Sequence, residues 1–300
     1  MALRGHFQHS HMVVKVIQWL GCICLLSIPA ISSIVFFPQP LSVGALKWIQ
    51  FIQTVALFLL PPLCMAYLWS DRPLAWLQFH TTPYTLRHIL CAIVLMIVAL
   101  PAINLIGYIN QQMTLPAFLQ PLETWMKTQE ENAAFLTEQF LNVSTMSGLI
   151  INILLMALLP AVAEELTFRG ILQRLFTPST HRLTPHIAIW CSAILFSAIH
   201  MQFYGFLPRM LMGALFGYLL VWTGSIWVPI LMHFTNNAMA VTLYFIASRQ
   251  GWEMDKVDTI GANDTLWLGV VSIVITCIGI YIFRRSTTIS NASSLMSNGN

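Results

Sequence analysis

The sequence predicts an all-α, polytopic membrane protein with about eight transmembrane helices. Its 300 residues are 57% hydrophobic and only 8% charged, a balance that is not typical of soluble globular domains. The apolar residues also gather in runs of about 20, the length at which a helix crosses a bilayer. The net charge of +3 does not indicate nucleic-acid binding, because the basic residues are scattered along the chain.

Short segments rich in proline or polar residues separate the apolar runs and predict where each span ends. Residues 38–40 follow the first run, for example, and the acidic segment 251–264 precedes the last. The first run is too long for the core of a cleaved signal peptide, so we expect it to be retained as a span. The eight expected spans are residues 15–37, 45–69, 86–109, 147–176, 184–202, 204–223, 226–247 and 265–283.

The chain is expected to form one membrane domain in three parts. Residues 1–145 hold the first three spans and an outer loop, residues 146–285 form a core of five spans, and residues 286–300 form a tail. The tail is rich in Ser and Asn and is expected to be disordered. In the outer loop, 110–146, apolar residues recur near helical spacing among acidic ones. This pattern predicts an amphipathic helix or hairpin on the membrane surface or over the bundle.

Basic residues flank the two ends of the expected spans unequally. Because cytoplasmic loops carry the excess of Lys and Arg, this asymmetry predicts that both termini are cytoplasmic. Arg209, at the outer start of a span, is expected to extend its charge to the membrane interface. The side of the termini has Arg4, Lys15, Arg72, Arg87, Arg174, Arg182, Arg284 and Arg285, and the other side has Lys47, Lys127, Arg249 and Lys256.

Two adjacent carboxylates lie inside the fourth expected span. An acidic residue at this depth is costly and therefore usually functional. Glu165 and Arg169 are four residues apart on a helix, so we expect an ion pair, which is also what a purely structural clamp would show. Glu164 lies ~100° away around the helix and is expected to face a polar pocket. Pro160, one turn earlier, is expected to kink the helix and open it to water.

Polar side chains that suit catalysis also occur on later spans. His200 ends an apolar run four residues after Phe196, and His233 is followed at the fourth position by Asn237. Residues four apart share a helix face, although Asn236 is an alternative partner for His233. A single buried His is often only an interhelical hydrogen bond, but a Glu, two His and an Asn together are harder to explain in that way. Their convergence requires tilted helices or a wedge-shaped cavity.

This set of side chains suits the hydrolysis of an amide bond by water. A carboxylate and an imidazole beside one water molecule act as a general base. A second imidazole and an amide N–H stabilise the oxyanion that forms. The chain has no His-Glu-x-x-His zinc helix and no Gly-x-Ser-x-Gly nucleophile motif, and no Asp lies inside an expected span. We therefore expect no cofactor, with zinc as the open alternative.

The ordered motifs resemble those of the CPBP family, which comprises type II CAAX prenyl endopeptidases and bacteriocin-processing or bacteriocin-immunity (Abi) proteins. The resemblance covers residues 150–245 and implies an intramembrane glutamate endopeptidase. It implies a membrane-associated protein or peptide as substrate, with the lipid bilayer as its surroundings, and a place in the bacterial cytoplasmic membrane. The motifs are Glu164-Glu165-x-x-x-Arg169, Phe196-x-x-x-His200 and His233-x-x-x-Asn237.

The resemblance also implies a role for each matching residue. Glu164 and His200 would activate the water. His233 and Asn237 would stabilise the oxyanion, while Glu165 and Arg169 would support the site.

Two other functions are open on the sequence alone. A non-catalytic protein of the same fold would act in bacteriocin immunity or as a scaffold for a partner. A proton-coupled transporter would use Glu164 as its proton carrier, but it needs no oxyanion donors. The presence of both His233 and Asn237 therefore favours the protease.

Overall fold

The computed structural model describes residues 3–80, 85–177, 184–252 and 259–297. Within these residues the regular structure is helical and no strand occurs. Seven helical segments are long and apolar enough to cross a bilayer, which confirms the predicted all-α, polytopic membrane fold. They are Met12–Phe36, Val43–Trp69, Leu86–Gln111, Met146–Leu175, Phe203–Thr223, Trp227–Gln250 and Asn263–Thr287.

The fifth expected span is shorter than predicted. Helix α10 covers Thr184–Ala198, and 15 residues extend only ~22 Å, less than the ~30 Å hydrocarbon core. Met201 then adopts a left-handed backbone with a φ of 55°, which turns the chain into η6 (Phe203–Gly205) and α11 (Phe206–Thr223). Helices α10 and α11 pack against each other as a hairpin, and His200 lies at its turn.

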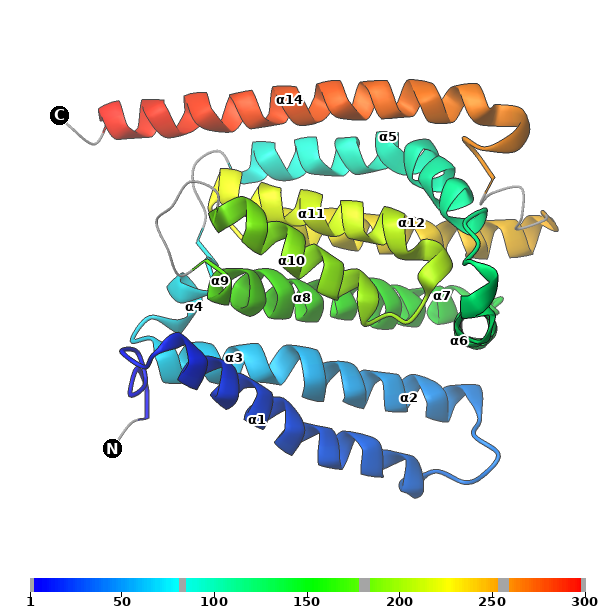
Figure 1. Ribbon diagram of the computed structural model, residues 1–300, viewed down its shortest axis with the longest axis horizontal. Coiled ribbons are helices and arrows are strands. Elements are labelled where there is room, and N and C mark those ends of the chain that lie inside the picture. The colour runs from blue at the N-terminus through cyan, green and yellow to red at the C-terminus, as the bar shows by residue number, and fades with distance from the viewer. Residues whose placement is uncertain (1–2, 81–84, 178–183, 253–258, 298–300) are drawn as a thin grey trace.

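The first two spans pack as a pair along one side of the bundle (Figure 1). The second span contains a π-helical segment where prolines follow in the sequence. Pro62 has no backbone N–H, so the carbonyl of Phe58 lacks its usual α-helical donor, and the hydroxyl of Thr167 donates to it at 2.7 Å. The elements here are α1 (Met12–Ser32), η1 (Ser33–Phe36), α2 (Val43–Thr54), η2 (Val55–Leu59), α3 (Leu60–Trp69) and α4 (Pro73–Trp76).

On the opposite side of the bundle, α5 (Thr85–Gln111) packs against α14 (Leu266–Ser297), which follows η7 (Asn263–Thr265). Figure 1 shows α5 bending towards its C-terminal end, and Pro101 lies inside this helix. The hydroxyl of Ser272 on α14 accepts the N–H of Ala102 at 3.1 Å and donates to the carbonyl of Val98 at 2.6 Å. It therefore replaces one backbone hydrogen bond of α5 and joins the two helices.

Helix α14 continues through Ser297, into the tail. The expectation that residues 286–300 are disordered stays a prediction. Residues 286–297 contain neither Gly nor Pro, so nothing in the sequence stops the helix. At the start of this segment the hydroxyl of Ser286 donates to the carbonyl of Phe283 on the preceding turn at 2.7 Å. The polar composition of residues 286–297 is therefore compatible with a continuing helix.

The outer loop forms α6 (Gln120–Leu141), which follows η3 (Ala117–Leu119) and gives the predicted amphipathic helix. Of the two expected positions, the structure has the one over the bundle. Glu130 of α6 accepts the backbone N–H of Tyr204, at the hairpin turn, at 3.2 Å. The carbonyl of Phe140 accepts the side-chain amide of Asn152 at 2.7 Å. Helix α6 therefore bridges the hairpin turn and the start of the fourth span.

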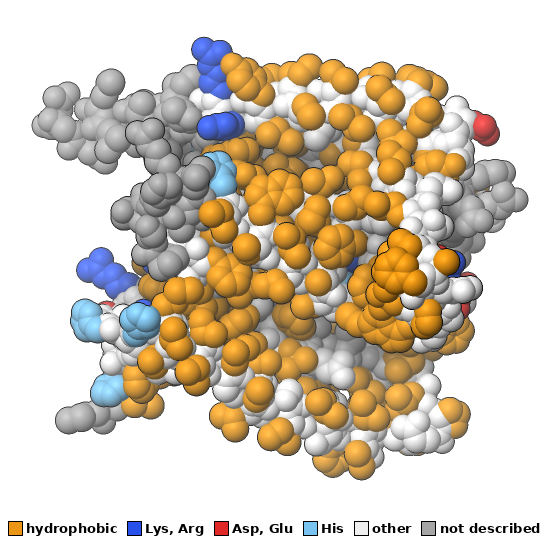
Figure 2. All heavy atoms as spheres, viewed as in Figure 1, with side chains coloured by type: hydrophobic (Ala, Val, Ile, Leu, Met, Phe, Trp, Pro, Cys, Tyr) orange, Lys and Arg blue, Asp and Glu red, His pale blue; other side chains and the backbone are white. Residues whose placement is uncertain are grey.

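The outer surface of the bundle is strongly apolar. Figure 2 shows hydrophobic side chains across most of the visible face, with charged and His side chains near its two ends. Large exposed apolar residues lie on helices at both sides of the bundle, such as Ile28 of α1 and Val274 of α14. So extensive an apolar surface is expected for an integral membrane protein. The first residues of α1 and the last of α14 lie at the same end (Figure 1), and their cytoplasmic location stays a prediction.

Candidate active site

The fourth span alternates between α-helical and π-helical geometry around the acidic pair. Pro160 lies in its α8 segment, and directly before it the N–H of Leu159 bonds to the carbonyl of Leu154, five residues earlier. The proline is thus accommodated by a wider turn, and such π segments frequently mark functional sites. The span consists of α7 (Met146–Asn152), η4 (Ile153–Leu158), α8 (Leu159–Glu165), η5 (Leu166–Leu172) and α9 (Gln173–Leu175).

Glu165 lies at the centre of a buried charge cluster. Its Oε1 atom is 2.8 Å from Nη1 of Arg169, so the expected ion pair is present, and 2.9 Å from Nδ1 of His233 on α12 (Trp227–Gln250). The side chains of Glu165 and Arg169 are 0% and 1% exposed. The same carboxylate oxygen accepts the Nη1–H of Arg169 and the Nδ1–H of His233. This hydrogen bond fixes the tautomer and orientation of the imidazole.

Glu164 points in a different direction from Glu165, as the helical spacing predicted. Its side chain is 17% exposed and lines a cavity. Its Oε2 atom is 3.8 Å from Nε2 of His233, which is too long for a hydrogen bond but suits a bridging water. The two adjacent carboxylates therefore contact opposite nitrogens of one imidazole.

Aromatic rings and a backbone carbonyl complete the surroundings of Arg169. Its guanidinium carbon lies 4.7 Å from the ring centre of Phe196 and 5.4 Å from that of Phe216. Its Nη2 atom donates to the carbonyl of Gly213 at 2.8 Å. Gly213 and Gly217 on α11 are four residues apart, and their missing side chains let α11 approach the fourth span closely.

Replacing Gly217 with Ala is expected to destabilise the protein by about 1–3 kcal/mol, the usual effect of overpacking. A Cβ atom there would lie 2.7 Å from Oε1 of Gln173 and 3.0 Å from Cγ2 of Ile189. Unfolding in a detergent titration measures the effect. Gly21→Ala is the matched control, because a Cβ at Gly21 meets no atom within 4 Å. Equal stability of both variants would contradict the close packing of α11.

His200 faces the cavity from the hairpin turn. Its Nδ1–H donates to the carbonyl of Phe196 at 2.7 Å, and since a carbonyl only accepts, Nε2 is left as a free acceptor. His200 and Glu164 line the same cavity without a direct contact between them. The early end of α10 thus brings His200 to the site from a position that the sequence placed near the outer surface.

Asn236 and Asn237 of α12 also line the cavity. Nδ2 of Asn236 donates to Oδ1 of Asn237 at 3.1 Å, so both N–H groups of Asn237 remain available to a ligand. This hydrogen bond favours Asn237 over Asn236 as a donor to an oxyanion.

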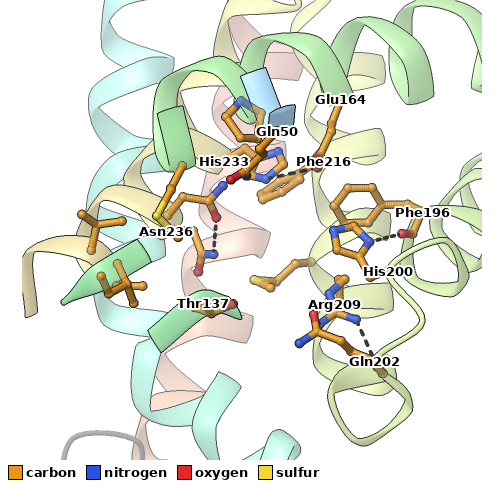
Figure 3. A pocket seen from close by; sticks show the side chains of 17 residues that line it. Gln50, Thr137, Glu164, Phe196, His200, Gln202, Arg209, Phe216, His233 and Asn236 are labelled. Atoms are coloured by element: carbon orange, nitrogen blue, oxygen red, sulfur yellow. Dashed lines mark hydrogen bonds and ion pairs between the residues drawn. The ribbon is translucent and has the colours of Figure 1, made fainter. Parts of the chain in front are cut away.

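The cavity has a volume of about 360 Å³ (Figure 3). The four predicted catalytic residues, Glu164, His200, His233 and Asn237, all line it. Their catalytic roles, and the supporting roles of Glu165 and Arg169, stay predictions. Four other polar residues of the cavity wall were not predicted as part of the site: Gln50, Thr137, Gln202 and Arg209. Gln50, Gln202 and Arg209 are polar within or beside an apolar run, whereas Thr137 lies on the amphipathic α6.

Arg209 was expected to extend its charge to the membrane interface, and its position relative to the membrane stays a prediction. Its side chain is in the cavity wall, where it donates to Gln202 (Figure 3). The reason is that the short α10 and the turn after it place the start of α11 beside the cavity.

The expectation of no cofactor, with zinc as the alternative, stays a prediction. Glu164, His200 and His233 are a combination that zinc accepts chemically. Among the described residues, no three His, Cys, Asp or Glu side chains come close enough to hold an ion as they are placed.

These features define a polytopic membrane protein with an acid–base cavity inside its helical bundle. Residues 146–239 match the family described as Type II CAAX prenyl endopeptidase Rce1-like. This match confirms, for the matched residues, the resemblance seen in the sequence.

One curated relative also matches part of the chain. The chain is 32% identical over 92 residues to the uncharacterized protein YpbD of Bacillus subtilis (strain 168). The match covers 29% of this chain and 43% of the relative, so it spans less than half of that protein. No solved structure matches the chain.

Proposed function

We propose that this protein is an intramembrane endopeptidase that hydrolyses a peptide bond of a membrane-associated substrate with an activated water molecule. One observation carries the proposal. A carboxylate, two imidazoles and a side-chain amide line one cavity, within a bundle whose outer surface is apolar. The match of residues 146–239 to a protease family supports it.

Glu164 is the general base in this proposal. Its carboxylate takes a proton from a water molecule, and the water oxygen forms a bond to the carbonyl carbon of the substrate. His200 faces the same cavity with an unprotonated Nε2 atom, so it accepts the second hydrogen of this water and orients it. Because Glu164 and His200 do not touch, the water lies between them.

The carbonyl oxygen becomes an oxyanion in this step. Asn237 has N–H groups available to donate to it. His233 donates from Nε2 only as an imidazolium, since its Nδ1–H already binds Glu165. The hydrogen bond to Glu165 holds the imidazole of His233 in place, and Arg169 holds Glu165 in position. When the carbon–nitrogen bond breaks, the leaving amine takes the proton from Glu164.

Cleavage is expected to be unaffected by chelators, because no residue in this mechanism requires a metal. Substrates would be identified by comparing the membrane proteomes of cells with the wild-type protein and cells with the Glu164→Gln variant. A peptide spanning the cleavage position would then be incubated with purified protein, with and without EDTA.

Rates that agree within about twofold would support a water mechanism without metal, since twofold is only ~0.4 kcal/mol in the barrier. Loss of cleavage that zinc restores would overturn that part of the proposal. Identical proteomes, with no uncleaved protein accumulating in the variant, would instead favour a non-catalytic scaffold.

A further inference from the structure

The guanidinium of Arg209 lies in the cavity wall without a carboxylate partner. Its Nη1 atom donates to the backbone carbonyl of Gln202 at 3.2 Å and its Nη2 atom to Oε1 of Gln202 at 3.1 Å, and both acceptors are neutral. Across the described part of the chain, no Asp or Glu forms an ion pair with it. Glu130 on α6 accepts the N–H of Tyr204, and both Glu130 and Glu164 attract the guanidinium only from beyond ion-pair distance. A charged side chain inside a membrane protein usually has a charged partner. The guanidinium of Arg209 is therefore available to pair with a ligand.

Local backbone geometry holds this guanidinium in place. Met201 has a φ of 55°, an uncommon conformation for a residue with a side chain, and it lies between His200 and Gln202. Both neighbours line the cavity as a result of this turn. Gly205 leaves the space that Arg209 fills, because a Cβ atom there would lie 3.1 Å from its Nη2.

The charges of the cavity wall are separated into two ends. Glu164 lies at one end, and its neighbours Glu165 and Arg169 neutralise each other. Arg209 lies at the other end, and Figure 3 shows His200 between Glu164 and Arg209. A ligand that carries a negative charge is therefore attracted to one end of the cavity and repelled from the other.

We propose that Arg209 and Gln202 form a carboxylate-binding subsite that orients the substrate and sets the distance to the bond that is cut. The inference rests on the proposed protease function. A guanidinium binds a carboxylate through two parallel hydrogen bonds, which specify direction as well as charge. The carboxylate belongs to the C-terminus of the substrate or to an acidic side chain. With it bound at Arg209, a peptide bond on its N-terminal side lies next to His200 and Glu164.

Binding is measured with the full chain in zwitterionic nanodiscs, carrying Glu164→Gln so that no probe is cleaved. Three probes share one acylated peptide, N-decanoyl-Leu-Ala-Leu. The first has a free C-terminal carboxylate, the second has a C-terminal amide, and the third has the amide with Glu as its last residue. A preference for the first probe identifies a C-terminal carboxylate as the ligand, and a preference for the third an acidic side chain.

A charged probe is expected to bind about tenfold more tightly than the neutral amide, equivalent to ~1.4 kcal/mol. Arg209→Gln should remove this preference, and Arg209→Lys should keep part of it because the charge remains without the planar geometry. Arg249→Gln, which removes the same charge at a position outside the cavity, should leave the preference unchanged.

Equal binding of charged and neutral probes to the protein with Arg209 intact would overturn the subsite, and so would failure of all three to bind. This comparison needs no Arg209 variant, so it holds even if Arg209→Gln does not fold. A preference that disappears in nanodiscs of anionic lipid would assign the site to a lipid headgroup and also overturn the peptide assignment.

The binding measurement and the cleavage measurement can fail separately, so a failure of the subsite can be distinguished from a failure of the proposed function. A tenfold preference in a protein that cleaves no peptide would keep the subsite and reject the protease. Cleavage that depends on Glu164 but not on a carboxylate of the substrate would keep the protease and reject the subsite.

Discussion

Glu164→Gln is expected to lower the rate of peptide cleavage by about 10²–10⁴-fold, the contribution of a positioned general base. Gln has nearly the same shape but cannot take a proton from water. The side chain lines the cavity and forms no ion pair with Arg169, so the fold should be retained. The rate would be measured with purified protein and the peptide defined by the proteome comparison.

Glu138→Gln is the matched control for this experiment. Glu138 is an exposed acid of α6 that does not line the cavity, so its variant should cleave at the wild-type rate. A folded Glu164→Gln protein with full activity would remove the general base from the mechanism. Equal losses in both variants would mean that α6 or overall charge, and not Glu164, controls the rate.

Arg169→Met is expected to destabilise the protein by about 3–5 kcal/mol, the usual effect of removing one partner of a buried ion pair. Arg169 is 1% exposed, and without it the carboxylate of Glu165 would retain only the hydrogen bond from His233. The carbonyl of Gly213 would also lose its donor. The free energy of unfolding would be measured by denaturing detergent titration.

Two further variants test the physical reason for this loss. Adding Glu165→Gln to Arg169→Met removes the unpaired charge and should recover much of the stability. Lys127→Met breaks a comparable pair with Glu123, also four residues apart, whose Lys side chain is 56% exposed. It should leave the unfolding midpoint unchanged, because solvent screens exposed pairs. Similar losses in Arg169→Met and Lys127→Met would show that burial is not what gives the pair its importance.

The positions of most helices could be predicted from the sequence, because hydrocarbon imposes both length and composition on a span. The end of α10 could not, since the apolar run continues past Ala198 to Ile199. The helix ends at the turn around Met201, which has a left-handed backbone conformation. Nothing in the sequence indicates this conformation, because Met rarely adopts it.

The candidate site, like the fold, could be predicted from the sequence only in part. Spacing alone predicted the ion pair of Glu165 with Arg169 and the different direction of Glu164, since both depend on the geometry of a single helix. The contact between Glu165 and His233 joins residues 68 positions apart, and no helical periodicity specifies such a pair. The resemblance assigned Glu164 and His200 to the same water, and in the structure the imidazole nearer to Glu164 is that of His233, at 3.8 Å.

By itself, then, the sequence determined the membrane class, the resemblance of the core to a protease family and the identity of the polar residues, because each of these follows from local composition and order. Only the tertiary structure decided which of those residues meet. The depth of His200 depends on where α10 stops, and the location of Arg209 depends on the turn that follows. Both are set by helix packing, in which glycines on α11 and the buried charge cluster determine how closely the spans approach.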